Sequence, residues 1–115
     1  MSLIPNAPQL WPFTIKELLD YVENDHTAKT LADTEGVSIF MRAFDEGQGL
    51  PEHTALGDVL IQVLEGEIVL TVEGTPIVLC AGQSLIVPAE ASRSPKAKVK
   101  TKLLVTLVKQ LKYKT

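Results

Sequence analysis

Glycine recurs along the chain at a nearly constant interval, and this spacing constrains the possible folds more than any other feature. The seven glycines lie at positions 36, 47, 49, 57, 66, 74 and 82. With 47 and 49 counted as one turn, successive turn sites are 8 to 11 residues apart. Such intervals are typical of antiparallel sandwiches and barrels, in which short strands alternate with tight turns. The spacing therefore predicts an all-β domain.

The segments between these turns are rich in Val, Ile and Leu, the residues that favour extended structure. We expect strands over residues 37–44, 59–64, 68–72, 77–80, 85–87 and 103–108. Several of them are apolar in both registers, as expected where one face lines a barrel and the other packs on a second layer or subunit. Everything after residue 27 is expected to be strand and turn.

One helix is predicted, over residues 14–24, before the first strand. Its apolar residues recur at helical spacing, namely Ile15, Leu18, Leu19 and Val22. Thr14 and Glu17 fit a capping box, in which each side chain bonds a backbone N–H left free by the first turn. Three prolines before it predict an extended arm, at positions 5, 8 and 12.

The length of 115 residues fits a single domain, with residues 1–26 as arm and helix and residues 27–115 as the barrel. With 45% apolar and 22% charged residues, neither a disordered tail nor a disulfide scaffold is indicated. A lone cysteine, Cys80, is typical of a reducing compartment. Without a secretory signal pattern or an apolar stretch of about 18 residues, we expect a cytoplasmic protein with no membrane partner.

The charges divide unevenly along the chain. Residues 1–90 carry three basic and 14 acidic side chains, whereas residues 91–115 carry eight basic and no acidic ones. Four lysines alternate and would share one side of an extended segment, Lys96, Lys98, Lys100 and Lys102. No aromatic residue stands between them to stack on bases, so we predict no nucleic-acid partner and interpret them as protection of an exposed strand or turn from edge pairing.

If the 103–108 strand pairs back into the barrel, the basic and acidic portions become neighbours in space. The asymmetry then reflects neutralisation across strands or across a dimer interface. Three terminal lysines would remain free for another role, Lys109, Lys112 and Lys114.

Two segments resemble the conserved motifs of the cupin superfamily. The first runs from Gly47 through His53 to Gly66, and the second runs from Gly82 through Pro88-Ala89-Glu90. The resemblance covers about half of the chain. It implies a jelly-roll barrel, or double-stranded β-helix, of six to eight strands and of the RmlC-like type. Such barrels are often homodimers with a pocket inside.

The same resemblance locates the positions at which metal-binding members of the family hold one divalent ion. The first histidine is present as His53, but the second histidine falls on Ala55 and the glutamate on Val59. The histidine of the second motif falls on Arg93. A divalent ion needs several deprotonated donors, and an arginine brings a permanent positive charge instead. No metal or other cofactor is therefore predicted.

Two polar residues are the best candidates for contacts with a ligand. Histidine is the side chain whose ordinary pKa is nearest to neutral pH. His53 belongs to a strand expected to face the cavity, or else it is a partly buried histidine satisfied by one backbone bond. Arg93 either points inward, where its donors can hold a carboxylate or phosphate, or lies at the rim beside Glu90 or another acid.

An apolar row accompanies these two residues. Val59, Ile61 and Val63 share one face by strand alternation. They either line a small-molecule cavity or simply fill the interior of a small barrel.

Two functions of different class follow from these residues. The favoured one is a metal-free barrel that binds a small organic ligand through His53 and Arg93, as a sensor or accessory domain. The alternative is a metal-dependent isomerase or oxygenase that uses His53 with Asp58 and Glu52, which requires a shifted strand register. These residues do not decide whether the protein is an enzyme. We expect Cys80 to be a buried, inert thiol and His26 to lie in a solvated loop.

Overall fold

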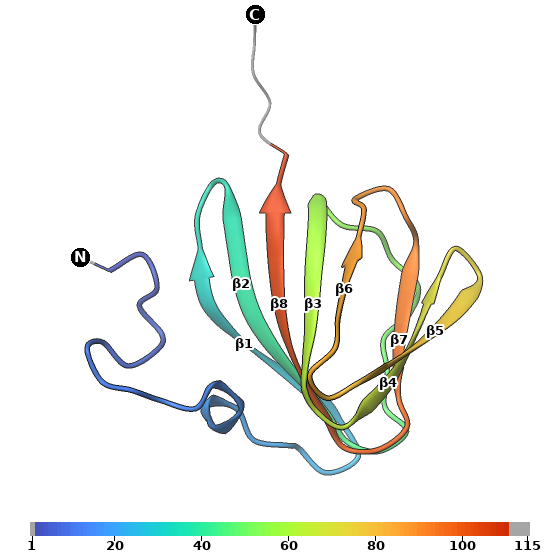
Figure 1. The fold of residues 1–115 in the computed structure, drawn as a ribbon, viewed down its shortest axis with the longest axis horizontal. Helices are drawn as coiled ribbons and strands as arrows, with labels where there is room; N and C mark the ends of the chain where they lie inside the picture. Colours follow the sequence, from blue (N-terminus) through green and yellow to red (C-terminus); the bar gives the residue numbers. More distant parts are fainter. Residues whose placement is uncertain (1, 111–115) are drawn as a thin grey trace, which may run out of the picture.

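The computed structural model describes residues 2–110 and shows eight strands in two facing sheets (Figure 1). The strands are β1 His26–Asp33, β2 Val37–Phe44, β3 Gly57–Glu65, β4 Glu67–Val72, β5 Thr75–Cys80, β6 Ser84–Val87, β7 Arg93–Ala97 and β8 Thr101–Lys109. The larger sheet has the order β1-β2-β8-β3-β6, and the smaller sheet has the order β5-β4-β7. All neighbouring strands are antiparallel, so the predicted all-β, double-sheet architecture is confirmed.

The last strand, β8, occupies the centre of the larger sheet, between β2 and β3 (Figure 1). Its register sets Val105 opposite Phe40 of β2 and Ile61 of β3. The segment of 103–108 therefore pairs back into the barrel as predicted. All six predicted strands are present, and their ends differ from the prediction by no more than two residues.

Two strands lack the apolar signal that revealed the others. β1 has one neighbour, β2, and its register is interrupted between Thr30 and Ala32. β7 is also an edge strand and contains Pro95, which edge strands tolerate because they leave some N–H positions unpaired. His26 begins β1, where it is half-buried 6.0 Å from the ring of Phe44, so its prediction as a solvated loop residue is wrong.

The predicted N-terminal helix is reduced to a single 3₁₀ turn, Ile15–Leu18. Thr14 makes no side-chain capping bond, and only its carbonyl accepts the N–H of Glu17, at 3.0 Å. Val22, expected on the buried face of the helix, is exposed. A short isolated helix is marginally stable in water, so contacts with the rest of the protein decide its conformation.

Those contacts come from lysines of the larger sheet, beside which the N-terminal segment lies (Figure 1). Lys102 of β8 donates to the carbonyl of Lys16 at 2.6 Å, and Lys29 of β1 donates to that of Leu18 at 3.5 Å. Both carbonyls are thereby bonded to strand side chains instead of to the next turn of a helix. The Tyr21 hydroxyl, further along, donates to Glu65 at 2.5 Å.

The four alternating lysines do not share one side of a strand. β7 ends at Ala97 and β8 begins at Thr101, so the chain turns between them. Lys102 is buried, with its ammonium group 5.0 Å from the ring centre of Tyr21. The interpretation as a protected strand edge is therefore wrong for this residue.

Basic and acidic portions of the chain do meet, as expected. Lys98 pairs with Glu67 at 3.0 Å, and Lys109 pairs with Asp33 at 2.7 Å. The prediction that Lys109 remains free is wrong, because the return of β8 into the sheet brings it to the end of β1. The other two terminal lysines lie outside the described residues, Lys112 and Lys114.

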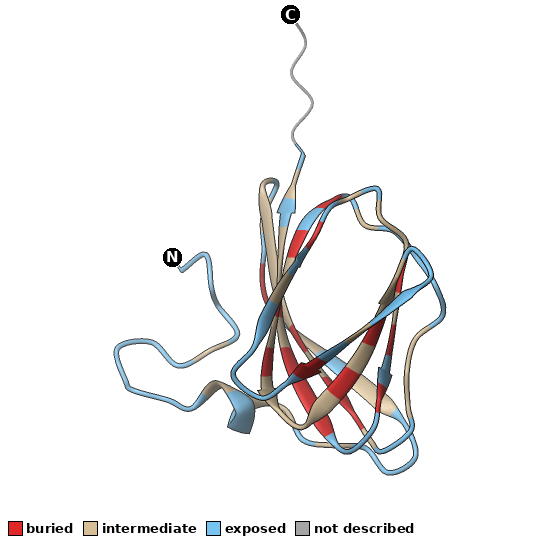
Figure 2. Cartoon of the chain, turned by 45° about the vertical axis from the view of Figure 1, so that its right-hand side comes forward, coloured by how far each residue is buried: buried red, intermediate tan, exposed pale blue. Residues whose placement is uncertain are grey.

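The hydrophobic core lies between the two sheets, where Figure 2 shows buried segments on facing strands. Phe44 and Ile68, from opposite sheets, are almost completely buried there. No helix of residues 2–110 is long and apolar enough to cross a membrane.

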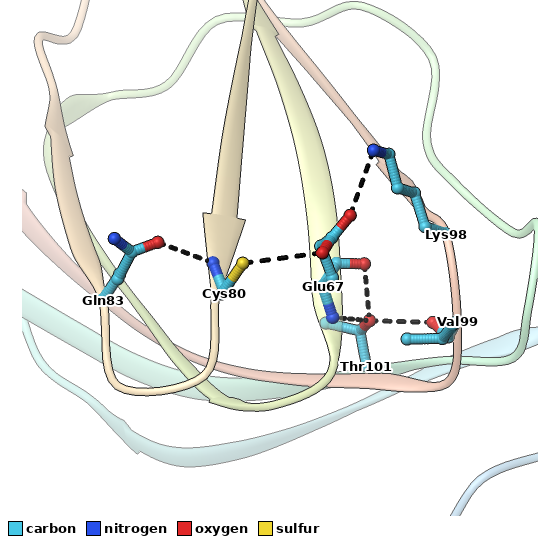
Figure 3. Close-up of polar contacts among 6 residues, drawn as sticks. All are labelled: Glu67, Cys80, Gln83, Lys98, Val99 and Thr101. Atoms are coloured by element: carbon cyan, nitrogen blue, oxygen red, sulfur yellow. Dashed lines mark hydrogen bonds and ion pairs between the residues drawn. The ribbon is translucent and has the colours of Figure 1, made fainter.

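The buried hydroxyl of Thr101, the first residue of β8, forms hydrogen bonds next to the turn between β3 and β4 (Figure 3). Thr101 is fully buried, and its Oγ1 accepts a hydrogen bond from the Glu67 N–H at 3.1 Å. The same hydroxyl lies 2.8 Å from the Val99 carbonyl and 3.0 Å from that of Glu67, either of which can accept its single hydrogen. Gly66 is required here because a Cβ would lie 2.2 Å from the Lys100 carbonyl oxygen, and because its φ is +92°.

Candidate functional site

A cavity of about 180 Å³ lies between the two sheets. Ten apolar side chains and three basic ones line it, the basic ones being Arg42, His53 and Arg93. Among the residues that the structure describes, no acidic side chain belongs to the lining. The cavity is therefore apolar over most of its wall and positively charged where it is polar.

Strand alternation produces the apolar wall. Val59 and Ile61 of β3 stand opposite Leu107 and Val105 of β8, and all four line the cavity. Residues two apart on a strand point to the same face, so each strand contributes every second side chain. Val63 continues this face and is buried in the core, but it lies outside the cavity lining.

His53 lies at the cavity in the loop that precedes β3, not on a strand. Its backbone exchanges two hydrogen bonds with Arg93, both of 2.9 Å, which form an isolated bridge. The side chain is exposed, and its Nδ1 lies 2.9 Å from the Pro51 carbonyl oxygen. When Nδ1 carries the hydrogen of a neutral ring, the Pro51 carbonyl accepts it and Nε2 keeps a free lone pair.

Arg93 is a buried residue of the cavity wall, so the alternative of a rim residue paired with Glu90 or another acid is wrong. Only 4% of Arg93 is exposed. Its Nε donates to the Ala91 carbonyl at 2.9 Å and its Nη2 donates to the Pro88 carbonyl at 2.7 Å. The loop between β6 and β7 thus holds the guanidinium through neutral oxygens. Burial lowers the pKa of Arg93, although an arginine stays charged at neutral pH.

Arg42 is a polar residue of the site that the sequence analysis missed. It lies on β2, and its guanidinium carbon is 5.2 Å from the centre of the Phe40 ring. Burial lowers the pKa of this guanidinium. Strand alternation could have indicated its position, because it sets Arg42 on the same face as the apolar Phe40 and Phe44.

The positions that hold metal in the resembling family come together at this cavity. Ala55, Val59 and Arg93 line it together with His53. Only His53 carries a group that donates an electron pair to a cation. Among residues 2–110, no cluster of three or more His, Cys, Asp or Glu side chains is arranged to hold a metal ion.

The alternative metal set of His53, Asp58 and Glu52 is not assembled at the cavity. Asp58 is exposed and accepts a hydrogen bond from the Ala89 N–H at 3.0 Å. Glu52 is also exposed and accepts a hydrogen bond from the Ser92 hydroxyl. Neither carboxylate belongs to the cavity lining.

Cys80 lies apart from the cavity, at the end of β5 (Figure 3). Its side chain is exposed, so the predicted burial is wrong. The thiol donates to Glu67 Oε1 at 3.5 Å. Partial desolvation and the hydrogen bond to Glu67 raise the pKa of the thiol, which lowers its reactivity as a nucleophile.

Solved structures of other proteins share this fold. A cupin superfamily protein from Desulfitobacterium hafniense aligns over 95% of this chain and 100% of its own, with 28% identity and a TM-score of 0.90. A conserved protein of unknown function from Streptococcus pyogenes aligns over 97% and 98% of the two chains, with 21% identity and a TM-score of 0.92.

A further likeness is to a cupin 2 conserved barrel domain protein from Leptotrichia buccalis. It is 31% identical over 84% of this chain, with a TM-score of 0.82, and the match spans 47% of that protein. No protein-family model matches the sequence, and a search of curated proteins found none that matches.

Proposed function

The chain is a cupin-type protein of the RmlC-like barrel fold, and from this premise we propose that its barrel binds a small organic molecule without a metal ion. The observation that carries the proposal is the wall of the cavity between the sheets. It combines ten apolar side chains with a few polar groups, among them His53 and Arg93. This composition is usual for small-molecule sites.

The volume of the cavity limits the size of the ligand. An apolar cavity of about 150 Å³ accommodates a molecule the size of benzene. At about 180 Å³, this cavity has room for one ring or a short chain with a polar substituent. Sites for drug-sized molecules are larger, from about 300 Å³ upwards. We therefore propose a small metabolite-like ligand, bound by a sensor or accessory domain.

A metal-dependent reaction has little support in the geometry. Ala55 and Val59 offer no donor, and the Arg93 guanidinium repels a cation from the position where a fourth ligand would stand. An isomerase or oxygenase built on His53, Asp58 and Glu52 would require both carboxylates to leave their present hydrogen bonds and enter the cavity.

We also propose that the protein is a homodimer in the cytoplasm. Several large apolar side chains of the N-terminal arm are exposed, among them Leu3, Leu10 and Trp11. A second copy of the chain would cover such a surface and remove it from water. Light scattering should give twice the monomer mass, and a Leu10→Ser, Trp11→Ser variant should shift the equilibrium towards monomer. A monomeric wild-type protein would refute the dimer.

The binding proposal is tested by filling the cavity. Val105 points into the cavity from β8, whereas Val108 of the same strand is exposed on the outside. We expect benzyl alcohol to give saturation-transfer NMR signals with the wild type and with Val108→Phe, but not with Val105→Phe. Ala55→Leu, at a half-buried position of the wall, should also reduce binding with less strain on the core.

The proposal fails if the variants Val105→Phe and Ala55→Leu fold and still bind the probe as the wild type does. It also fails if none of a set of one-ring probes binds the wild type at millimolar concentration. Thermal melting of each variant shows whether it is folded.

A further inference from the structure

The three polar groups of the cavity wall are all basic, which separates this site from a merely apolar pocket. Arg42 and Arg93 are permanently charged, and no carboxylate of residues 2–110 lines the cavity, although the chain carries 14 acidic residues and a formal net charge of −3. A charge in apolar surroundings is costly unless an opposite charge compensates it. A bound anion would supply this compensation.

The guanidinium of Arg93 is held in one orientation by the backbone and keeps donors for a bound anion. Two backbone carbonyls fix its Nε and Nη2, so the guanidinium plane has little freedom. Its Nη1 donates to no other group of residues 2–110. Because no buried side-chain nitrogen of these residues lacks a partner, Nη1 keeps solvent access. Backbone carbonyls orient the group but do not neutralise its charge.

Arg42 reaches the same cavity from the opposite sheet. It belongs to β2 of the larger sheet, whereas Arg93 belongs to β7 of the smaller one. Its guanidinium lies over the Phe40 ring and makes no hydrogen bond or ion pair with the described residues. All of its N–H donors are therefore available to a ligand.

We propose that Arg42 and Arg93 together bind the carboxylate of a small apolar acid. A carboxylate has two oxygens with several lone pairs and accepts hydrogen bonds from two guanidinium groups at once. The hydrocarbon part of the acid lies against Val59, Ile61 and Val105, and the volume limits it to about one ring or a short chain. This inference rests on the proposed small-molecule function and names the class of its ligand.

The test compares acids with neutral amides of the same shape. Benzoate is paired with benzamide, and hexanoate with hexanamide, and the dissociation constant of each is measured by NMR titration of the protein. We expect at least one acid to bind wild-type protein about tenfold or more tightly than its amide, because hydrogen bonds to charged groups are the stronger ones.

Substitution of Arg42 then tests whether the preference for acids over amides arises in the cavity. In Arg42→Gln the acid should lose most of its advantage over the amide, while Arg42→Lys should keep part of it, because the charge remains but the fork of donors is lost. Lys96→Gln is the matched control, since it removes one positive charge from an exposed position of β7 outside the cavity. It should leave the preference unchanged.

The possible outcomes separate this inference from the proposal on which it rests. Equal binding of acids and amides overturns the carboxylate and leaves a small-molecule site standing. A preference that survives in a folded Arg42→Gln variant, or that falls equally in Lys96→Gln, overturns the role of Arg42. If neither acids nor amides bind and benzyl alcohol also fails, the small-molecule proposal itself is refuted, and this inference with it.

Discussion

Replacement of Thr101 by valine removes one buried hydroxyl and almost nothing else, because the two side chains have nearly the same shape. Thr101 is fully buried, and its hydroxyl accepts the Glu67 N–H and donates to a carbonyl of Val99 or Glu67 (Figure 3). The pairing of β4 with β7 ends at Ile68 and Ala97, one residue short of Glu67. The Thr101 hydroxyl is the partner of the Glu67 N–H beyond the end of that pairing. The substitution leaves that N–H without a partner.

The loss of stability in Thr101→Val depends on which backbone groups lose their only hydrogen bond. The Glu67 carbonyl keeps a second partner, the Lys98 N–H at 3.0 Å, and Val99 is an exposed residue of the turn between β7 and β8. The Glu67 N–H therefore dominates the loss. An orphaned buried donor costs about 1–3 kcal/mol, so we expect the free energy of unfolding to fall by about 2 kcal/mol.

Urea denaturation followed by circular dichroism measures this loss. With a urea dependence of about 1.5 kcal/mol/M, a loss of about 2 kcal/mol lowers the midpoint by about 1.3 M. Thr106→Val is the matched control, because Thr106 lies on the same strand, is only half-buried and makes no side-chain hydrogen bond to the described residues. If both variants change the midpoint by the same small amount, the reasoning about the orphaned Glu67 N–H is refuted.

Three further predictions concern single contacts. Lys109→Ala should raise the pKa of Asp33, which the lysine now lowers, so the variant should lose stability at neutral pH. The part of this loss that comes from Asp33 should vanish as pH falls below the folded-state pKa of Asp33, whereas the part from the lost bond of Lys109 Nζ to the Thr34 carbonyl, at 2.7 Å, should remain; NMR titration of the carboxyl and urea melts check both. Gly57→Ala should cost about 3 kcal/mol or more in urea, because a Cβ would lie 1.9 Å from a carbonyl oxygen of β8, and a smaller loss contradicts this. Glu67→Gln should lower the pKa of the Cys80 thiol and make iodoacetamide labelling about threefold faster at pH 8, whereas an unchanged rate would show that the carboxylate has no influence.

The strands of the barrel were predictable because their signals are local. Glycine turns and apolar alternation act within a few residues, so β2 through β6 and β8 appear near their expected positions. The predicted helix failed for the opposite reason. Its apolar residues have helical spacing, but lysines from β1 and β8 bond the carbonyls of Lys16 and Leu18, and such long-range contacts override a weak local preference.

The chemistry missing from the cavity was also determined by the sequence. Ala55 and Val59 have no donor atoms in any conformation, and Arg93 is cationic wherever it lies. Residue identity alone therefore decides that these three positions offer no electron pair to a metal ion. The apolar part of the cavity wall was likewise predictable, because alternation along one strand sets Val59 and Ile61 on the same face.

Only the tertiary structure decided that two arginines share this cavity. Arg42 and Arg93 are about fifty residues apart and lie on opposite sheets, so no periodicity within a strand relates them. The burial of Arg93 depends on carbonyls of the loop after β6, and its sequence neighbour Glu90 had suggested a surface pair instead. Side-chain identity is a property of the chain, whereas proximity across a barrel arises from the way its sheets close around the core.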